Sequence, residues 1–153
     1  TERCRCMDRN KAELLHELNR AIIRFRGSYS VWSNAQGISY HEMLVYYTIR
    51  EYGFCTQKLI CESYLLPKQT INNVFANLRK KGILLQDRAR STGREKAFVL
   101  SEAGKENYLQ CIGKLDEAET DAFDRMGEEK MQALKDLFLE YDKALGLSLG
   151  ETK

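Results

Sequence analysis

The chain has 153 residues, of which 43% are hydrophobic, with a formal net charge of +2 and a single proline. This length and composition predict one globular, mainly helical domain that is large enough to be stable alone. No apolar run is long enough to span a membrane. Five cysteines without the spacing of a small disulfide-rich domain favour a reducing compartment, so we expect a cytoplasmic protein.

The first seven residues are polar and carry Cys4 and Cys6 beside Arg3 and Arg5. Neighbouring cations lower the pKa of a thiol, so these cysteines could be reactive. The alternative interpretation is an exposed tail with incidental thiols. The pair is not a zinc motif, because a single residue between the cysteines is too few and no second pair follows.

The first long helix is predicted over residues 8–27, with Asp8 as its cap and Gly27 as its end. Apolar residues recur in it at helical spacing (Leu14, Leu15, Leu18, Ile22 and Phe25). The following residues, 28–37, have no clear period and predict an ordered loop that holds Tyr29 and Trp32.

Two helix starts follow. Ser39 and Glu42 have the spacing of a capping box, which predicts a helix that runs to Tyr52 and stops at Gly53. Thr56 then caps a short helix to about Tyr64, and a tight connection leads into the next helix. Two short helices joined so closely predict a helix-turn-helix, although the usual glycine in the turn is absent.

The second helix of this pair is predicted over residues 67–81, between Pro67 and Gly82. Its apolar side repeats at helical spacing (Ile71, Val74, Phe75 and Leu78). Its other side is rich in amides and has no acidic residue (Gln69, Asn72, Asn73, Ala76 and Lys80). Amide side chains can pair with adenine through two hydrogen bonds, so this face predicts base recognition; the alternative is a polar face that only contacts water.

A β-hairpin with a basic tip is predicted next. Residues 83–88 and 95–100 have the composition of strands, and residues 90–94 that of a turn. Between Arg79 and Lys96 there are seven basic residues and two acidic ones. The basic charge is therefore concentrated where a phosphate backbone would lie.

The C-terminal part is predicted to form two helices. Ser101 and Glu102 cap the first, which extends to about Met126, and the second starts at Glu128 and reaches about Leu145. Residues 116–129 contain seven acidic residues and one basic residue. We expect this end of the molecule to avoid DNA.

The order of these elements, and several short motifs within residues 39–104, resemble the MarR family of bacterial transcriptional regulators. The resemblance is carried by residues 56–59, 67–72, 78–83 and 94–104. In the last piece Arg94, Leu100, Ser101 and Gly104 match the family's wing signature, which has an Asp-Arg-Arg tip followed by Leu-Thr-x-x-Gly. Thr92 and Gly93 replace the Asp and the first Arg of that tip.

The resemblance implies a mainly α fold with a small β-hairpin wing. It implies a single domain over residues 1–153, with a winged helix-turn-helix lobe at 39–100 and a helical dimerisation region at 8–27 and 101–146. It also implies an obligate homodimer that binds a pseudo-palindromic operator in double-stranded DNA. A repressor released by a small molecule is the commoner case, and no cofactor or metal is expected.

We assign DNA contacts to ten residues. Gln69, Asn72 and Asn73 should read bases, with a preference for adenine. Phosphate contacts are expected from Lys68, Thr70 and Lys80 on the helix and from Arg88 and Arg90 in the wing. Arg94 at the tip should enter the minor groove, and Lys96 completes the basic wing.

An effector site is expected between the first helix and the DNA-binding lobe, where the resemblance places a ligand pocket. Its candidate residues are Tyr29, Trp32, Tyr40 and His41, which suit a small aromatic ligand. The rival hypothesis is a thiol sensor of the same fold, in which one of the cysteines is oxidised (Cys4, Cys6, Cys55, Cys61 or Cys111).

Two other function classes fit the sequence less well. An enzyme is disfavoured, because the two histidines, His16 and His41, lie on separate helices and no phosphate loop, metal cluster or nucleophile elbow is present. A Cys–His pair formed by folding stays possible in principle. A winged helix used for protein–protein contact would predict a wing without its arginines.

Overall fold

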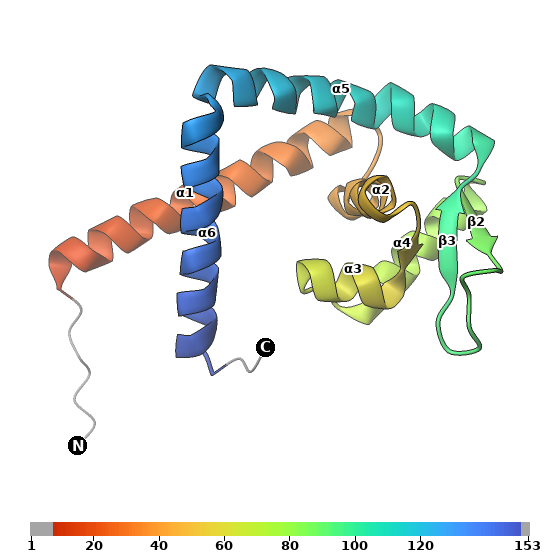
Figure 1. Ribbon diagram of the computed structural model, residues 1–153, viewed down its shortest axis with the longest axis horizontal. Helices are drawn as coiled ribbons and strands as arrows, with labels where there is room; N and C mark the ends of the chain where they lie inside the picture. Colours follow the sequence, from red (N-terminus) through yellow and green to blue (C-terminus); the bar gives the residue numbers. More distant parts are fainter. Residues whose placement is uncertain (1–7, 151–153) are drawn as a thin grey trace. The chain divides into compact units, whose positions relative to one another are not determined.

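The computed structural model describes residues 8–150 and shows a mainly helical chain with one small sheet (Figure 1). The chain divides into two compact units, one ending at Tyr108 and one beginning at Leu109. The elements in chain order are α1 (Arg9–Ala35), α2 (Tyr40–Tyr52), β1 (Cys55–Thr56), α3 (Gln57–Tyr64), α4 (Lys68–Lys80), β2 (Leu84–Asp87), β3 (Ala97–Leu100), α5 (Glu102–Met126) and α6 (Glu128–Ser148).

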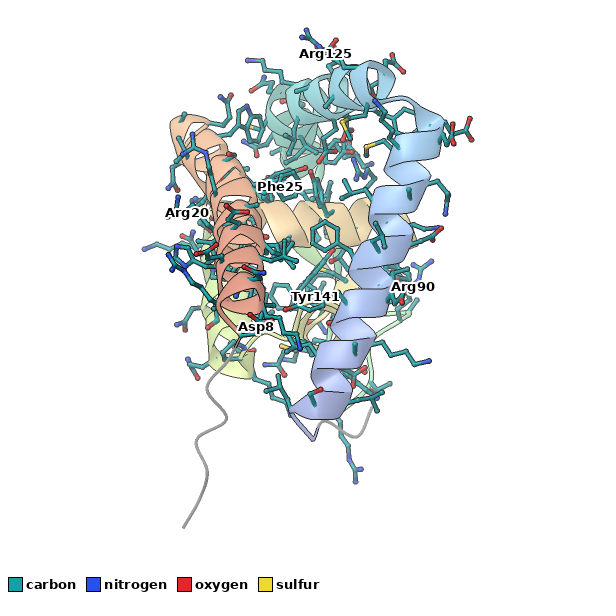
Figure 2. All side chains as sticks on the ribbon, turned by 90° about the vertical axis from the view of Figure 1, so that its left-hand side faces the viewer. Asp8, Arg20, Phe25, Arg90, Arg125 and Tyr141 are labelled. Atoms are coloured by element: carbon teal, nitrogen blue, oxygen red, sulfur yellow. The ribbon has the colours of Figure 1, made fainter. Side chains whose placement is uncertain are left out.

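Helix α1 is longer than the sequence predicted. Asp8 lies at its start, as expected (Figure 2). It caps the helix by accepting a hydrogen bond from the Asn10 N–H. The helix continues through Gly27 to Ala35, so the predicted loop at 28–37 is wrong. A glycine inside a helix costs only about 1 kcal/mol relative to alanine, which the residues around it outweigh here. The stop comes at Gly37, whose φ of +78° ends the helix.

The caps predicted for α2 and α3 are also confirmed. Ser39 and Glu42 exchange both hydrogen bonds of a capping box at the start of α2, and Gly53 ends that helix with φ +80°. The Thr56 hydroxyl accepts from the Leu59 N–H at the start of α3. These local signals were readable because each involves residues within four positions of one another.

The sheet has three antiparallel strands in the order β1-β3-β2. The predicted hairpin is present, with Leu84 opposite Leu100 and Asp87 opposite Ala97. Both strands are shorter than predicted, because the side chains of Asp87 and Ser91, together with turn hydrogen bonds, replace the strand ladder beyond Asp87. The sequence did not predict β1, whose Cys55 pairs with Phe98.

The core of the first unit lies where α2, α3, α4 and the sheet converge. The largest fully buried side chains there come from helices and strand alike (Met43, Val45, Tyr46, Thr48, Cys55, Ile60, Ile71 and Leu78). The Tyr46 hydroxyl donates to Asn107 Oδ1, so a buried tyrosine has its polar atom satisfied. Among the described residues, no buried side-chain polar atom lacks a partner.

The second unit contains the later part of α5 and all of α6. The glycine predicted to separate these helices, Gly127, has φ +84° and ends α5. Arg125 lies in the last turn of α5, and Tyr141 projects from α6 (Figure 2). Of the residues of α6, only Gly146 is buried.

Candidate nucleic-acid interface

Helix α4 presents one apolar and one polar side, as its sequence predicts. Ile71, Phe75 and Leu78 are buried in the core. On the other side Gln69, Asn72, Asn73, Ala76 and Lys80 are all exposed. The first turn contains no acidic residue, and Pro67 at the cap supplies no side-chain acceptor for the N–H groups there. The positive end of the helix dipole therefore stays open to an anion.

Leu65 makes the turn between α3 and α4. It adopts φ +51° and ψ +48°, and it is the only described residue other than glycine with a positive φ. The N–H groups of Leu65 and Leu66 both donate to the Cys61 carbonyl, which closes the end of α3. Leu65 thus takes the left-handed position in the turn of the helix-turn-helix, where a glycine is usual.

The wing between β2 and β3 is shaped by side chains of its own loop. Asp87 Oδ1 accepts from the Ala89 and Arg90 N–H groups, and its other oxygen pairs with the Arg90 guanidinium. The hydrogen bond from Arg90 holds the pKa of the Asp87 carboxyl below its ordinary value. Thr92 and Glu95 exchange backbone and side-chain hydrogen bonds around the tip, where Arg94 is exposed.

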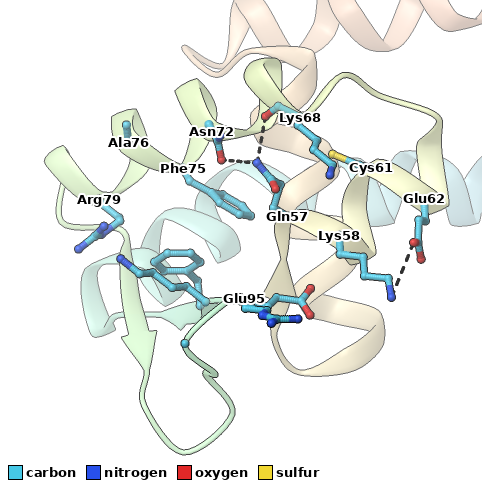
Figure 3. Close-up of a pocket in the computed structure, with 14 residues that line it drawn as sticks. Gln57, Lys58, Cys61, Glu62, Lys68, Asn72, Phe75, Ala76, Arg79 and Glu95 are labelled. Carbon is cyan, nitrogen blue, oxygen red and sulfur yellow. Dashed lines mark hydrogen bonds and ion pairs between the residues drawn. The ribbon is translucent and has the colours of Figure 1, made fainter.

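A cavity of about 720 Å³ lies between α3, α4 and the wing (Figure 3). Phe75 and Phe98 line it, with ring centroids 4.9 Å apart, and the Arg79 guanidinium lies 5.4 Å from the Phe98 ring. Five basic side chains and two acidic ones line it as well (Lys58, Lys68, Arg79, Arg94 and Lys96; Glu62 and Glu95). This excess of positive charge suits a phosphate backbone.

A buried carboxylate ties α4 to α2. Glu42 Oε1 accepts from Asn77 Nδ2 at 2.7 Å and from Lys81 Nζ at 3.0 Å. Its Oε2 accepts from the Ser39 N–H at 2.8 Å, which is half of the capping box. Only 4% of the Glu42 side chain is exposed. One group thus fixes the last turn of α4 against the first turn of α2.

Solved structures have the same fold. NMB1585, a MarR family regulator from Neisseria meningitidis, superposes with a TM-score of 0.80 at 24% identity, over 92% of this chain and 99% of its own. The chain has the MarR fold. NadR in complex with 4-hydroxyphenylacetate superposes with a TM-score of 0.68 at 19% identity, over 82% of this chain and 89% of its own.

A third structure with the MarR fold is that of BpsR from Bordetella bronchiseptica, described for the regulation of its DNA binding by 6-hydroxynicotinic acid. It superposes with a TM-score of 0.65 at 15% identity, over 83% of this chain and 91% of its own. No protein-family model and no curated protein sequence matches the chain. The likeness therefore lies in the fold rather than in the sequence.

The MarR fold brings some of the predicted DNA contacts together and leaves others apart. Lys68, Asn72, Arg94 and Lys96 line the cavity. The remaining exposed candidates lie outside its lining (Gln69, Asn73, Lys80 and Arg88), as does the half-buried Thr70. Arg90 is engaged elsewhere, because its guanidinium pairs with Asp87 and lies 5.2 Å from the Phe54 ring.

Sequence reasoning missed the contribution of α3 to the cavity. Gln57 and Lys58 line it from the start of that helix, directly after the cap at Thr56. Polar residues in the first turn of the leading helix were the available signal. Their position opposite the wing depends on how α3 and α4 pack, which no local pattern encodes.

The four effector candidates fall on two helices of the MarR fold. Tyr29 and Trp32 lie on α1 rather than in a loop, and Tyr40 and His41 form the first turn of α2. All four are half-buried. The centroids of the Tyr40 and His41 rings are 5.9 Å apart. The Arg26 guanidinium lies 5.1 Å from the centroid of the Tyr40 ring. None of the four lines the cavity between α4 and the wing.

The described cysteines differ in accessibility. Burial raises the pKa of Cys55 to about 12, so its thiol stays protonated. Desolvation also raises the pKa of Cys61, against the opposing effect of Lys68. Cys111 is buried. Cys4 and Cys6 lie outside the described residues.

No group of three or more His, Cys, Asp or Glu residues within residues 8–150 could hold a metal ion. No helix in the same range is long and apolar enough to cross a membrane.

Proposed function

We propose that the protein is a sequence-specific DNA-binding transcriptional regulator rather than an enzyme. The observation that carries this proposal is the basic cavity between an amide-faced α4 and the wing (Figure 3). A phosphate backbone fits against its basic rim while the exposed side of α4 enters the major groove. NMB1585 is named as a MarR family regulator, and BpsR is described for the regulation of its DNA binding, which supports the same class.

We assign each residue its DNA contact from its position on α4 or on the wing. Gln69, Asn72 and Asn73 face away from the core and read base edges in this proposal. Phosphates are held by Lys68, Thr70, Lys80, Arg88 and Lys96, and Arg94 at the tip enters the minor groove. Arg90 acts through the shape of the wing, because Asp87 already holds its guanidinium.

The regulator acts as a homodimer on a pseudo-palindromic operator in this proposal. Large apolar side chains are exposed on α1, including Phe25 at 62% and Val31 at 72%. On α6 the same holds for Leu137 at 64%, with Leu134, Phe138 and Leu145 also exposed. Surfaces of this kind mark protein contacts. Two copies would place their α4 helices in half-sites about 34 Å apart.

DNA binding is tested by gel shift with duplex DNA from the region upstream of the gene, at 50 and 200 mM salt. We expect a shift whose affinity falls steeply with salt, because phosphate contacts release counterions. Lys80→Ala should weaken binding to all sequences and flatten the salt dependence, whereas Lys130→Ala on α6 should change neither. A protein–protein module of the same fold would give no shift at either salt concentration.

The effector of this regulator is a small aromatic acid that binds near Tyr29, Trp32, Tyr40 and His41. The ligands named for NadR and BpsR are aromatic, and Arg26 beside Tyr40 offers a charge for a carboxylate. Such a ligand shifts DNA affinity only by its differential binding to the two states. Thiol sensing is disfavoured at Cys55, whose thiol is buried and protonated.

One experiment distinguishes control by an aromatic ligand from control by thiol oxidation. Aromatic acids and peroxide are added to the DNA complex of the wild type and of a cysteine-free variant, with Ala at Cys55 and Cys111 and Ser elsewhere. We expect release by an aromatic acid in both proteins. Release by peroxide alone, which disappears in the cysteine-free variant, would identify a thiol sensor instead.

A further inference from the structure

Gln57, the first residue of α3, reaches across to α4 with a single amide group. Its Nε2 donates to the Lys68 carbonyl at 3.3 Å and also to Asn72 Oδ1 (Figure 3). These two acceptors lie 11 and 15 residues along the chain from Gln57. All three residues line the cavity between α4 and the wing.

The Lys68 carbonyl determines which amide atoms of Gln57 and Asn72 donate and which accept. A backbone carbonyl can only accept a hydrogen bond, so the Gln57 atom that faces it must be the NH₂ group. The same NH₂ group faces the amide of Asn72, which must therefore turn its oxygen toward Gln57. The Nδ2 of Asn72 is then the atom directed away from α3.

This polarity changes what Asn72 can recognise. An asparagine that pairs with adenine through two hydrogen bonds uses its oxygen for N6 and its nitrogen for N7. With the oxygen engaged by Gln57, Asn72 presents two N–H donors. In the major groove, acceptors without a neighbouring donor on the same base are the O6 and N7 of guanine and the O4 of thymine.

We propose that Gln57 is a positioning residue that determines specificity, because it makes Asn72 a donor toward guanine or thymine instead of a reader of adenine. The inference rests on the proposed DNA binding and differs from the adenine preference expected for Asn72. A similar bond joins Gln69 Nε2 to Asn73 Oδ1 at 3.0 Å. Among the described residues, no backbone acceptor fixes the direction of that pair. Asn73 can therefore present either its oxygen or its NH₂ group to a base.

The test is selection of bound duplexes from a random pool, followed by sequencing. Wild type, Gln57→Met, Asn72→Ala and the double variant are compared, with Gln132→Met on α6 as the matched control. Comparison of wild type with Asn72→Ala identifies the base position that Asn72 reads. In the wild type this position should favour guanine or thymine by roughly tenfold.

Gln57→Met has nearly the length of glutamine but no donor, so it should relax the preference at that position and leave the other positions unchanged. The double variant should match Asn72→Ala, and Gln132→Met should match the wild type. Melting curves of all variants establish that they are folded. A lowered melting temperature with an unchanged base preference would show a merely structural role and overturn the inference.

The inference and the proposed function fail in different ways. If the wild type enriches no sequence, the proposed DNA recognition is wrong. If the wild type enriches a site in which Asn72 reads adenine, or if Gln57→Met enriches the same bases at every position, DNA binding stands and the role of Gln57 is wrong.

Discussion

Gly104 occupies a place where no side chain fits. A Cβ added there would lie 2.3 Å from the Ile83 carbonyl oxygen. The neighbouring Ser101 explains this close approach, since its N–H donates to the same carbonyl and its hydroxyl donates to the Gly82 carbonyl. The Gly104 N–H in turn donates to the Ser101 hydroxyl. Serine and glycine three residues apart thus join the start of α5 to the start of β2.

Gly104→Ala should lower the free energy of unfolding by about 1–3 kcal/mol, because the new methyl group forces a backbone to move. Urea denaturation at a fixed protein concentration measures this change. Gly113→Ala is the matched control within the same helix, where no atom lies within 4 Å of the added Cβ. The control should be neutral or gain about 0.5–1 kcal/mol, and equal losses in both variants would contradict the steric explanation.

Leu65 stores strain in the turn of the helix-turn-helix. A left-handed conformation costs an L-residue roughly 1–2 kcal/mol, and Leu65 is 72% exposed, so little burial offsets this cost. Leu65→Gly should therefore raise the free energy of unfolding by up to about 1 kcal/mol, since the greater freedom of glycine in the unfolded chain cancels part of the relief. Thermal denaturation would refute this if the glycine variant melted below the wild type.

At the scale of elements, the wing depends on the charge of one residue. The pKa of Asp87 is lowered in the folded chain, mainly by its hydrogen bond from Arg90. A lowered pKa means that the ionised form stabilises the fold, so this contribution is present above the pKa of the unfolded chain, near 3.8. It disappears as the pH falls through the lower, folded value.

We expect amide exchange in residues 88–96 to accelerate in Asp87→Asn at pH 7, because asparagine cannot form the ion pair with Arg90. In the wild type the same residues should stay protected at pH 7 and lose protection only as the pH falls through the lowered, folded pKa of Asp87. Glu62→Gln is the control, since it removes an exposed carboxylate of α3 that pairs with Lys58. If the asparagine variant kept a fully protected wing, the shape of the loop would come from its Ser and Thr bonds alone.

Sequence patterns predicted the elements whose signals are local. The amide-faced α4, the capping box at Ser39 and the stops at Gly53 and Gly127 were all readable from neighbouring residues. Helix α1 runs beyond its predicted end, because one glycine inside a helix does not stop it when the residues on both sides are helical. Strand β1 was missed, because its two residues gain their hydrogen bonds from β3, about 40 residues away. The direction of the Asn72 amide likewise depends on a contact between helices.

The exposed apolar residues of α6 predict that the protein is a dimer. Leu137→Glu should convert the protein to a monomer in sedimentation velocity, because a charge cannot be buried unpaired at an interface. The same variant should bind a full operator much more weakly, since two linked half-sites bind more tightly than one.

Leu85→Glu is the matched control for this test, because Leu85 is 55% exposed but lies on the wing. It should leave the sedimentation coefficient of the dimer unchanged. Dimers of Leu137→Glu with wild-type stability would exclude α6 from the interface.

The carboxylate of Glu42 has a consequence for how new specificities could arise on this scaffold. It holds α4 at its C-terminal end, through Asn77 and Lys81, whereas the amide residues proposed to read bases lie in the first half of the helix. The C-terminal end of α4, which attaches the helix to α2, and the first half, which is proposed to read bases, can therefore change independently. A lineage, or a protein engineer, can exchange the exposed residues between Lys68 and Ala76 without disturbing the attachment, provided that Gln57 changes together with Asn72.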